Sequence, residues 1–383
     1  ITIKKINKYK GFVMLAINLV VTALMSVSKG ESDLNKLAST YQNIEQWQKR
    51  VETVRHGILQ GAQLWPIPEK TPLRPRIHSR RTHNGYIVEN IAFESLPGFF
   101  VTGNLYRPLE VINRSPIILC PHGHFEGGRF REDMQQRCAT FARMGAVAFS
   151  YDMVGWEESN QLNHGDEPVL TLQLWNSIRA IDFLVSLQDT DSKHIAVTGA
   201  SGGGTQAFLL AAVDDRITLS IPVVMVSSDF YGGCNCESGL PIHRSDGHTT
   251  NNADIAAMVA PNPQLLISCG DDWTKNTPTH EYPYIRNVYQ LFDAEDKVEN
   301  LHLSEEGHSY GYQKRLGAYR FLAKYFDLSL ESASNPDGSV NETPNIIESR
   351  EAMAAFNQEN QQPEPPPQGK ADIIDILRRA QKL

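Results

Sequence analysis

The chain alternates short runs of apolar, β-branched residues with longer stretches in which apolar residues recur every three or four positions. The short runs predict strands, and their continuous apolar character is typical of parallel strands buried on both faces of a sheet. The longer stretches predict helices, because this spacing places apolar side chains on one helix face. The predicted strands are 116–124, 146–153, 194–201, 217–226, 264–270 and 298–304. The predicted helices are 134–145, 170–187, 205–213, 282–294 and 313–328.

Segment 86–108 has a different pattern, in which apolar and polar residues alternate on both sides of Pro97-Gly98. This alternation predicts two antiparallel strands joined at that turn. Strands that then alternate with helices argue for a mostly parallel sheet covered by helices on both faces. We therefore predict an α/β fold, a three-layer α/β/α sandwich, over residues 86–330.

The segments that flank this region differ from it in composition. Residues 31–85 predict a helical extension followed by a proline-rich connector, because apolar residues recur there at helical spacing. Residues 331–383 form a polar, proline-rich tail. Its last part, 371–383, has the amphipathic pattern of a short helix, which could be docked or free.

Residues 1–28 have the layout of a targeting segment. Lysines precede an apolar run from Gly11 to Val27, and small residues stand at its end. This layout is typical of a secretory signal peptide. The run is also just long enough to span a bilayer, so an uncleaved anchor is the alternative, and a buried helix is a third. We expect an exported protein, secreted or periplasmic, that meets a membrane only if this segment is retained.

Charge and cysteine content narrow the class of protein further. The net charge is −8, and residues 1–30 carry five lysines and no acid, so the remaining chain is strongly acidic. Such a chain is a poor candidate for non-specific nucleic-acid binding. Five cysteines are too few for a disulfide scaffold. Cys234 and Cys236 are too close in sequence for the usual zinc spacing and lack a second pair, so we expect buried thiols with at most one or two disulfides.

The glycine-rich turn at residues 199–204, which follows a predicted strand, is compatible with two kinds of chemistry. A dinucleotide-binding turn would need its last glycine where Thr205 stands, and it would follow the first strand of the sheet. Tyr310 and Lys314 have the spacing of a dehydrogenase pair, but such pairs arise easily by chance. The same turn is also G-x-S-x-G, in which glycines 199 and 203 make room for Ser201 as a nucleophile.

A serine nucleophile needs a histidine base and a carboxylate, each placed just past a later strand. His308 meets this condition in a glycine-marked loop after the last predicted strand, whereas His302 lies inside that strand and is expected to be structural. Asp271 and Asp272 follow the preceding strand, and both are candidates for the acid. Taken alone, their segment could equally be a polar turn that caps a helix.

The oxyanion that forms when a serine attacks a carbonyl group must be held by backbone N–H groups. Gly202, directly after the serine, is expected to supply one of them. The other is expected from His124 or Phe125, in the loop after strand 116–124. His122 and His124 could instead bind a metal, but no acidic or histidine partner stands at a convincing spacing, so this is a minor alternative.

Seven segments together resemble a known family. They are PHGH (121–124), YDMVGWEES (151–159), GASGGGTQ (199–206), GGCNCE (232–237), TNNADIAAMVAP (250–261), DWTKNTP (272–278) and EGHSYG (306–311). On them, the chain from about 60 to 330 resembles α/β-hydrolases of the acetyl xylan esterase-like type, relatives of dienelactone hydrolases and prolyl oligopeptidases. The resemblance implies Ser201 as nucleophile, Asp272 as the favoured acid and His308 as base, with no metal and no organic cofactor.

These observations predict an exported serine esterase that hydrolyses acetyl or other short acyl esters, on small molecules or on a polysaccharide such as xylan. A serine peptidase of the prolyl oligopeptidase type is one alternative, although too few residues precede the hairpin for a propeller domain. A non-catalytic binding protein with the hydrolase fold is another, and the complete set of catalytic residues argues against it. Segment 227–262, with Tyr231 and Asn251-Asn252, is expected to form a lid or pocket wall, or simply to pack over the sheet edge.

Overall fold

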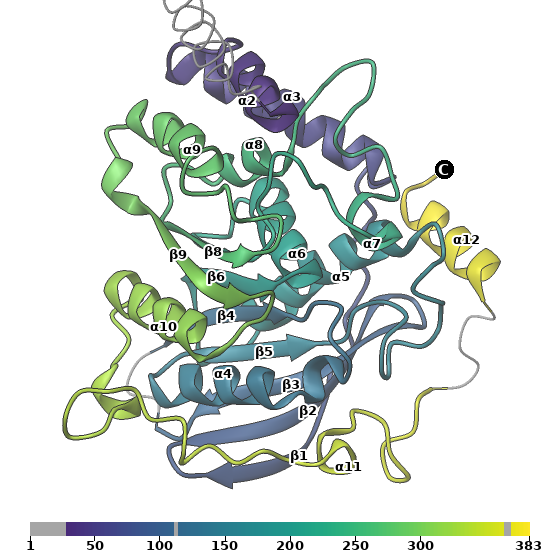
Figure 1. The fold of residues 1–383 in the computed structure, drawn as a ribbon. Helices are drawn as coiled ribbons and strands as arrows, with labels where there is room; N and C mark the ends of the chain where they lie inside the picture. The colour runs from purple at the N-terminus through teal and green to yellow at the C-terminus, as the bar shows by residue number, and fades with distance from the viewer. Residues whose placement is uncertain (1–27, 111–113, 364–368) are drawn as a thin grey trace, which may run out of the picture.

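A nine-stranded mixed sheet organises the computed structural model, which describes residues 28–110, 114–363 and 369–383 (Figure 1). The strand order is β1-β2-β3-β5-β4-β6-β7-β8-β9, antiparallel from β1 to β5 and parallel from β5 to β9. The strands are β1 (Arg76–His83), β2 (Tyr86–Leu96), β3 (Phe99–Pro108), β4 (Ser115–Pro121), β5 (Val147–Tyr151), β6 (Thr190–Ala200), β7 (Leu219–Val223), β8 (Gln264–Asp271) and β9 (Val298–Gly307). The predicted hairpin and the mostly parallel sheet are confirmed.

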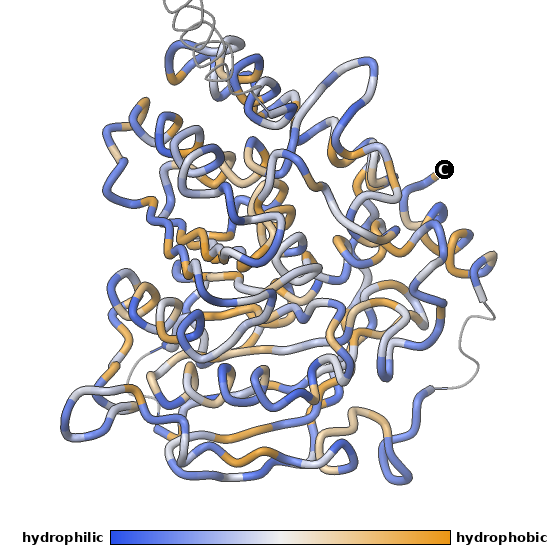
Figure 2. Tube along the Cα trace, viewed as in Figure 1, coloured by the Kyte–Doolittle hydropathy of each residue, from blue (hydrophilic) through white to orange (hydrophobic). Residues whose placement is uncertain are grey.

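Helices cover both faces of the sheet, as predicted. Alternate side chains of β4 face opposite ways, so Ile117 and Leu119 join one hydrophobic cluster and Ile118 and Cys120 join the other. The first cluster lies under α5 (Val169–Val185), α6 (Gly202–Val213) and α9 (Glu281–Gln290), with α2 (Lys29–Ala38), α3 (Ile44–Gly61), α8 (Asn252–Ala257) and α12 (Lys370–Ala380) around them. The second lies under α4 (Glu132–Arg143) and α10 (Tyr312–Phe326). Figure 2 shows the hydrophobic residues along the strands and the hydrophilic ones on the outer loops.

Two flanking segments are more closely integrated than their composition suggested. Strand β1 lies within the segment that we assigned to the helical extension, yet it pairs along β2 at one edge of the sheet. The polar tail is not free: residues 331–363 run past α10 and α4 and along β1, and helix α12 docks through Ile373 and Leu377 (Figure 1). Chain on both sides of residues 86–330 therefore belongs to this fold: β1 extends the sheet, and the tail packs against it.

The prediction of a signal peptide or anchor falls on residues that lie almost entirely outside the described ranges. Within those ranges, no helix is both long enough and apolar enough to cross a membrane.

The parallel strands place four loops at one edge of the sheet. Their carboxyl ends point the same way, so the loops after β4, β6, β8 and β9 come together there. These loops carry His122 to Phe125, Ser201, Asp272 and His308, respectively. Any joint chemistry of these residues therefore takes place at this edge of the sheet.

Candidate active site

Ser201 stands at the sharp turn between β6 and α6, with a φ of 58° and a ψ of −125°. A positive φ is unfavourable for a residue with a side chain, and such strain is typical of functional turns. Its N–H donates to the Val223 carbonyl at 3.1 Å, and its own carbonyl accepts from Gly204 at 2.7 Å. Because both bonds fix the backbone, the strained conformation is held in place. Among the described residues, no side chain hydrogen-bonds to the Ser201 hydroxyl, which remains available for a substrate.

The glycines around Ser201 are required by close backbone approach. A Cβ at Gly199 would lie 2.6 Å from the Gly203 carbonyl carbon, and a Cβ at Gly203 would lie 2.5 Å from the Pro121 carbonyl oxygen. Side chains at either position would push β6, α6 and the end of β4 apart. Helix α6 begins at Gly202, so the positive end of its dipole lies beside the serine.

Asp272 and His308 form a tight pair across two loops. His308 Nδ1 lies 2.7 Å from Asp272 Oδ2. The other carboxylate oxygen, Oδ1, accepts hydrogen bonds from the N–H and the hydroxyl of Thr274, at 2.6 and 2.5 Å. Since an ionised carboxylate can only accept a hydrogen bond, Nδ1 of His308 carries the proton and donates it to Asp272. Nε2 is then left free as a base.

The electrostatics of this pair favour a carboxylate. Burial disfavours the charge on Asp272, but hydrogen bonds from His308 and Thr274 outweigh it and lower the pKa of the carboxyl below its ordinary value. The His308 ring packs against Trp273, with ring centroids 4.5 Å apart, and against Phe125, at 5.8 Å. The imidazole is therefore oriented by an anion on one side and by two aromatic rings.

Asp271, the alternative acid, has a different environment. It ends β8, where it pairs with Gly307 in the sheet, and it is exposed. Among the described residues, Asp272 rather than Asp271 contacts His308. The structure thus brings together the pair that the resemblance favoured, while the catalytic role of each residue stays a prediction.

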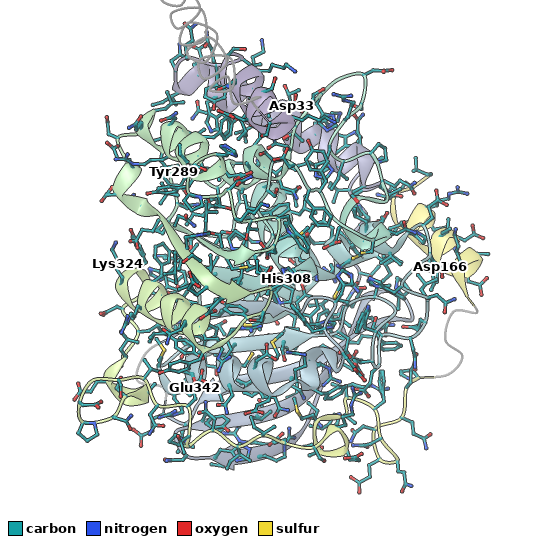
Figure 3. All side chains as sticks on the ribbon, in the orientation of Figure 1. Asp33, Asp166, Tyr289, His308, Lys324 and Glu342 are labelled. Atoms are coloured by element: carbon teal, nitrogen blue, oxygen red, sulfur yellow. The ribbon has the colours of Figure 1, made fainter. Side chains whose placement is uncertain are left out.

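The loop after β4 lies between Ser201 and His308. A Cβ at Gly123 would come within 2.9 Å of the Ser201 Cβ, while the Phe125 ring contacts His308. A hydrogen bond of 2.7 Å between the hydroxyls of Thr198 and Tyr310 joins β6 to the His308 loop. Ser201 and His308 themselves are not hydrogen-bonded in the described structure, and such contacts often tighten only when substrate binds. His308 lies near the middle of the view in Figure 3.

Tyr310 and Lys314, considered as a dehydrogenase pair, have structural contacts instead. Tyr310 is buried against Thr198, and Lys314 Nζ donates to Glu306 at 2.6 Å and to the Gly307 carbonyl at 2.9 Å. Both residues therefore brace the loop that presents His308. His302 is likewise bonded within the sheet, to the Ser268 hydroxyl at 2.9 Å.

The expected oxyanion donors lie beside Ser201. No backbone hydrogen bond within the described ranges uses the N–H of Gly202, His124 or Phe125. The His124 ring packs on Gly202, where a Cβ would lie 2.6 Å from its Cε1. Burial lowers the pKa of His122 to about 3, so His122 is neutral. It donates from Nδ1 to the Gly123 carbonyl at 2.8 Å and accepts the Met153 N–H at Nε2 at 3.0 Å, which fixes the loop.

Segment 227–262 forms one wall of this region. The Phe230 ring contacts Trp273, with centroids 4.2 Å apart, so the segment reaches the aromatic neighbour of His308. Asn252 holds it by donating to the Phe230 carbonyl at 3.2 Å and by a 2.7 Å contact with His243. Asn251 caps helix α8. The wall therefore joins the candidate site through Phe230.

The sequence did not predict a second cluster next to the serine. Side chains of His124, His164, Cys234 and Cys236 converge, with one nitrogen or sulfur of each within 4.8 Å of the others. The two cysteines stood out in the sequence without ligand partners at recognisable spacing. The partners are histidines that lie 70 or more positions earlier in the chain, and only the fold brings them close.

Comparison with known proteins identifies the family. The solved structure of methylesterase BT1017 matches with a TM-score of 0.85 and 39% sequence identity, over 92% of this chain and 79% of that chain. The chain is a carbohydrate esterase of the α/β-hydrolase fold. The family model for fungal glucuronyl esterases matches residues 162–256 of this esterase, which include Ser201.

Two more distant proteins are also similar to this chain. Acetyl esterase Axe7A of Xylanibacter ruminicola is 25% identical over 157 residues, and the match spans 36% of each chain, about a third of that protein's length. A CE15 glucuronoyl esterase from Teredinibacter turnerae is similar in fold, with a TM-score of 0.55 and 12% identity over 74% of this chain and 86% of that one.

Proposed function

We propose that this esterase hydrolyses a methyl ester on a sugar acid, with Ser201 as nucleophile. The observation that carries the proposal is the similarity to a methylesterase over nearly the whole chain. A methyl ester on a carbohydrate requires a carboxyl group, so the acyl part of the substrate is a uronic acid. The match to a glucuronyl esterase model supports the same acyl part.

In the first step, Ser201 Oγ forms a bond to the ester carbonyl carbon. His308 accepts the serine proton at Nε2, which the Asp272 contact at Nδ1 leaves free. The carbonyl electrons move onto oxygen, and the oxyanion is held by the N–H groups of Gly202 and of His124 or Phe125. When the oxyanion collapses, the bond to the methoxy oxygen breaks and His308 protonates it, so methanol leaves.

In the second step, His308 removes a proton from water, and the hydroxide adds to the acyl carbon. The bond to Ser201 then breaks, the serine regains its proton, and the free sugar acid leaves. Asp272 stays ionised throughout, consistent with its lowered pKa, and stabilises the imidazolium that forms twice in the cycle.

An acetyl ester on a polysaccharide is the second candidate, and the match to an acetyl esterase favours it. The chemistry at Ser201 would be the same, but the two ends of the substrate would exchange roles. The acyl group would be small and the leaving group would be the sugar hydroxyl. The two candidates therefore differ in the product that leaves first, methanol or the sugar.

The deciding experiment measures methanol and acetate released from two polymers, a methyl-esterified polyuronide and an acetylated xylan. We expect methanol from the first at a rate well above acetate from the second, with Ser201→Ala inactive on both. Acetate release alone would replace the proposal with the second candidate. If folded protein that reacts with a fluorophosphonate releases neither methanol nor acetate, both candidate functions are overturned.

A further inference from the structure

The four-residue cluster beside Ser201 joins three separate loops. His124 lies after β4, His164 lies between β5 and α5, and Cys234 and Cys236 lie at the start of the short helix α7 (Asn235–Ser238). Asp166, two residues after His164, is labelled to the right of His308 in Figure 3. Only Cys236 is fully buried, so the other three ligands remain partly accessible.

The donor atoms are arranged around a common centre. His124 Nε2 lies 3.0 Å from His164 Nε2 and 3.1 Å from the Sγ atoms of both Cys234 and Cys236. Cys234 Sγ lies 3.8 Å from His164 Nε2 and 2.6 Å from Cys236 Sγ. In a tetrahedral zinc site, bond lengths of about 2.0–2.3 Å separate the donor atoms by roughly 3.3–3.8 Å. Of these five separations, only the one between Cys234 Sγ and His164 Nε2 lies in that range. The other four are shorter, the sulfur–sulfur separation most of all, so the ligands would move outward to accommodate the ion.

Polar groups outside the cluster stand behind both imidazoles, within hydrogen-bond distance for His164 alone. His164 Nδ1 lies 2.6 Å from the Val154 carbonyl, so it carries the proton and leaves the Nε2 lone pair facing the cluster. His124 presents Nε2 to the cluster, and its Nδ1 faces a Glu237 carboxylate oxygen at 4.0 Å. A backbone carbonyl or a carboxylate behind the distal ring nitrogen is the usual support of a metal-bound histidine.

Other contacts hold the three loops together. The Trp156 ring packs edge-on against both histidines, with centroids 5.8 Å from His164 and 6.1 Å from His124. Asn235, between the two cysteines, donates its side-chain N–H to the Gly165 carbonyl at 2.6 Å. The donor atoms are thus positioned by packing and hydrogen bonds before any ion binds.

We propose that His124, His164, Cys234 and Cys236 bind one Zn²⁺ ion in a closed, tetrahedral site. Two thiolates and two imidazoles are a preferred donor set for zinc. Four protein ligands leave no open position, so the ion would be structural and take no part in the ester chemistry. Both sulfurs would bind as thiolates, and any proton that they carry would be released to solvent. The expectation of no metal rested on the family resemblance and on the spacing of the cysteines. The fold supplies the second pair of ligands that the spacing lacked.

The site would act on the esterase through the loop after β4. The His124 ring contacts Gly202, and the His124 backbone is one of the expected oxyanion donors. Ligation at Nε2 would therefore fix this loop against the start of α6. Zinc binding itself does not depend on the proposed substrate; only the expected loss of activity on zinc removal does.

The test measures metal content and thermal stability before activity. Protein purified under reducing conditions is dialysed against Zn²⁺, freed of excess, and analysed by mass spectrometry for zinc per chain. We expect one zinc per chain, and a lower Tm after chelation that is restored by Zn²⁺. Cobalt added to the chelated protein should give the sulfur-to-metal charge-transfer and visible bands of a tetrahedral thiolate site.

Variants distinguish zinc bound at this site from zinc bound adventitiously elsewhere. Cys234→Ser and His164→Ala should each lose stoichiometric zinc and the chelator-dependent change in Tm, while retaining esterase activity at a reduced kcat. His194→Ala, at an exposed histidine on β6, is the matched control and should keep the zinc. The proposal is overturned if reduced wild-type protein takes up no zinc, or if either ligand variant keeps the metal.

Discussion

The parallel and antiparallel halves of the sheet differ in the partners that their polar groups have within the chain. In the parallel half, Ser201 keeps its hydroxyl without a partner among the described residues, and nearby backbone N–H groups stay free. In the antiparallel half, the C-terminal segment supplies partners for several buried polar and charged groups. The free groups around Ser201 thus lie at an edge where a substrate can satisfy them. Elsewhere, a few buried hydroxyls such as Ser95 Oγ and Ser150 Oγ also have no partner among the described residues, but they face the interior of the fold.

Arg129 shows how the antiparallel half is closed. This side chain is 0% exposed, and it donates to Asp152 at 2.8 Å, to the Met353 carbonyl at 3.1 Å, and to Asn104 and Glu158. The tail thus supplies one acceptor, and residues of β3 and of the loop after β5 supply the others, for a guanidinium that would be costly to bury alone.

The edge strand β1 is protected in the same manner. His78 contacts the Ala355 carbonyl at 2.9 Å, and Glu348 pairs with Arg81 at 2.7 Å and with His83 at 2.6 Å. An exposed sheet edge invites pairing with other chains, and a segment that lies along the edge prevents it. Figure 1 shows the tail following β1.

The largest expected effect lies in the parallel half. Ser201→Ala should lower kcat by about 10⁴-fold or more, because no acyl-enzyme can form. The Tm should stay within about 1–2 °C of wild type, since the hydroxyl makes no hydrogen bond within the described protein. Steady-state methanol release and calorimetry check the two expectations. Activity retained by this variant would remove the distinction between the two halves.

The next effect distinguishes the two neighbouring aspartates. Asp272→Asn should lower kcat by about 10²–10⁴-fold, because an amide can stabilise neither the required tautomer nor the imidazolium of His308. Asp271→Asn, the matched control, should change kcat by less than about threefold, because that side chain is exposed at the end of β8. Parallel kinetics on the two variants test the assignment, and the reverse order of effects would transfer the role of acid to Asp271.

An intermediate effect is expected in the antiparallel half, and on stability instead of catalysis. Glu348→Gln should lower the free energy of unfolding at pH 7 by about 1–3 kcal/mol, since it breaks a charge-assisted pair with Arg81. Burial opposes the charge, but Arg81 and His83 outweigh it and lower the pKa of the Glu348 carboxyl. Urea unfolding, followed alongside kcat, should show unchanged catalysis.

The stability lost in Glu348→Gln should depend on pH, in a direction set by the lowered pKa of the Glu348 carboxyl. A carboxyl whose pKa is lower in the folded state stabilises the fold at pH values above its unfolded pKa of about 4.3, and this stabilisation fades as pH falls through the folded value. The difference between wild type and Glu348→Gln should therefore be full at neutral pH and shrink below about pH 4. A difference that grew in acid would contradict the assigned ion pair.

The smallest effect is expected for an exposed pair in the parallel half. Lys324 and Glu299 lie 2.7 Å apart, with half of each side chain in solvent. Lys324→Ala should change the free energy of unfolding by less than about 0.5 kcal/mol, because solvent screens such pairs. Thermal unfolding measures this change in stability. A larger loss would show that the difference in burial does not explain why Glu348 contributes more to stability than this pair.

The sequence predicted the parallel strands because their apolar runs are buried on both faces. Strand β1 carried no such signal: RIHSRRTH has mostly exposed side chains and pairs only at the sheet edge. The tail was equally hard to interpret, because it docks through a few buried residues such as Met353 amid a polar composition. These elements are stable through contacts with distant segments, which local pattern does not record.

At the candidate site, the order of serine, acid and histidine along the chain was enough to predict His308 and the adjacent pair Asp271 and Asp272. The choice against Asp271 came from a resemblance, because two adjacent aspartates differ in direction only once β8 is placed. The histidine–cysteine cluster had no local signal, since His124 and His164 stand 40 positions apart in unrelated loops.

The last described helix, α12, also determines when folding can finish during synthesis of the chain. The Glu69 N–H donates to the Ala380 carbonyl at 2.7 Å, and Gln381 donates to the carbonyls of Gln63 and Pro66 at 2.9 and 2.8 Å. The connector after α3 therefore obtains these partners only when the end of this sequence has been synthesised. Because the ribosome makes the amino-terminal part first, a chain interrupted before residue 370 would leave the connector and the apolar surface under Ile373 uncovered, a state that proteases recognise.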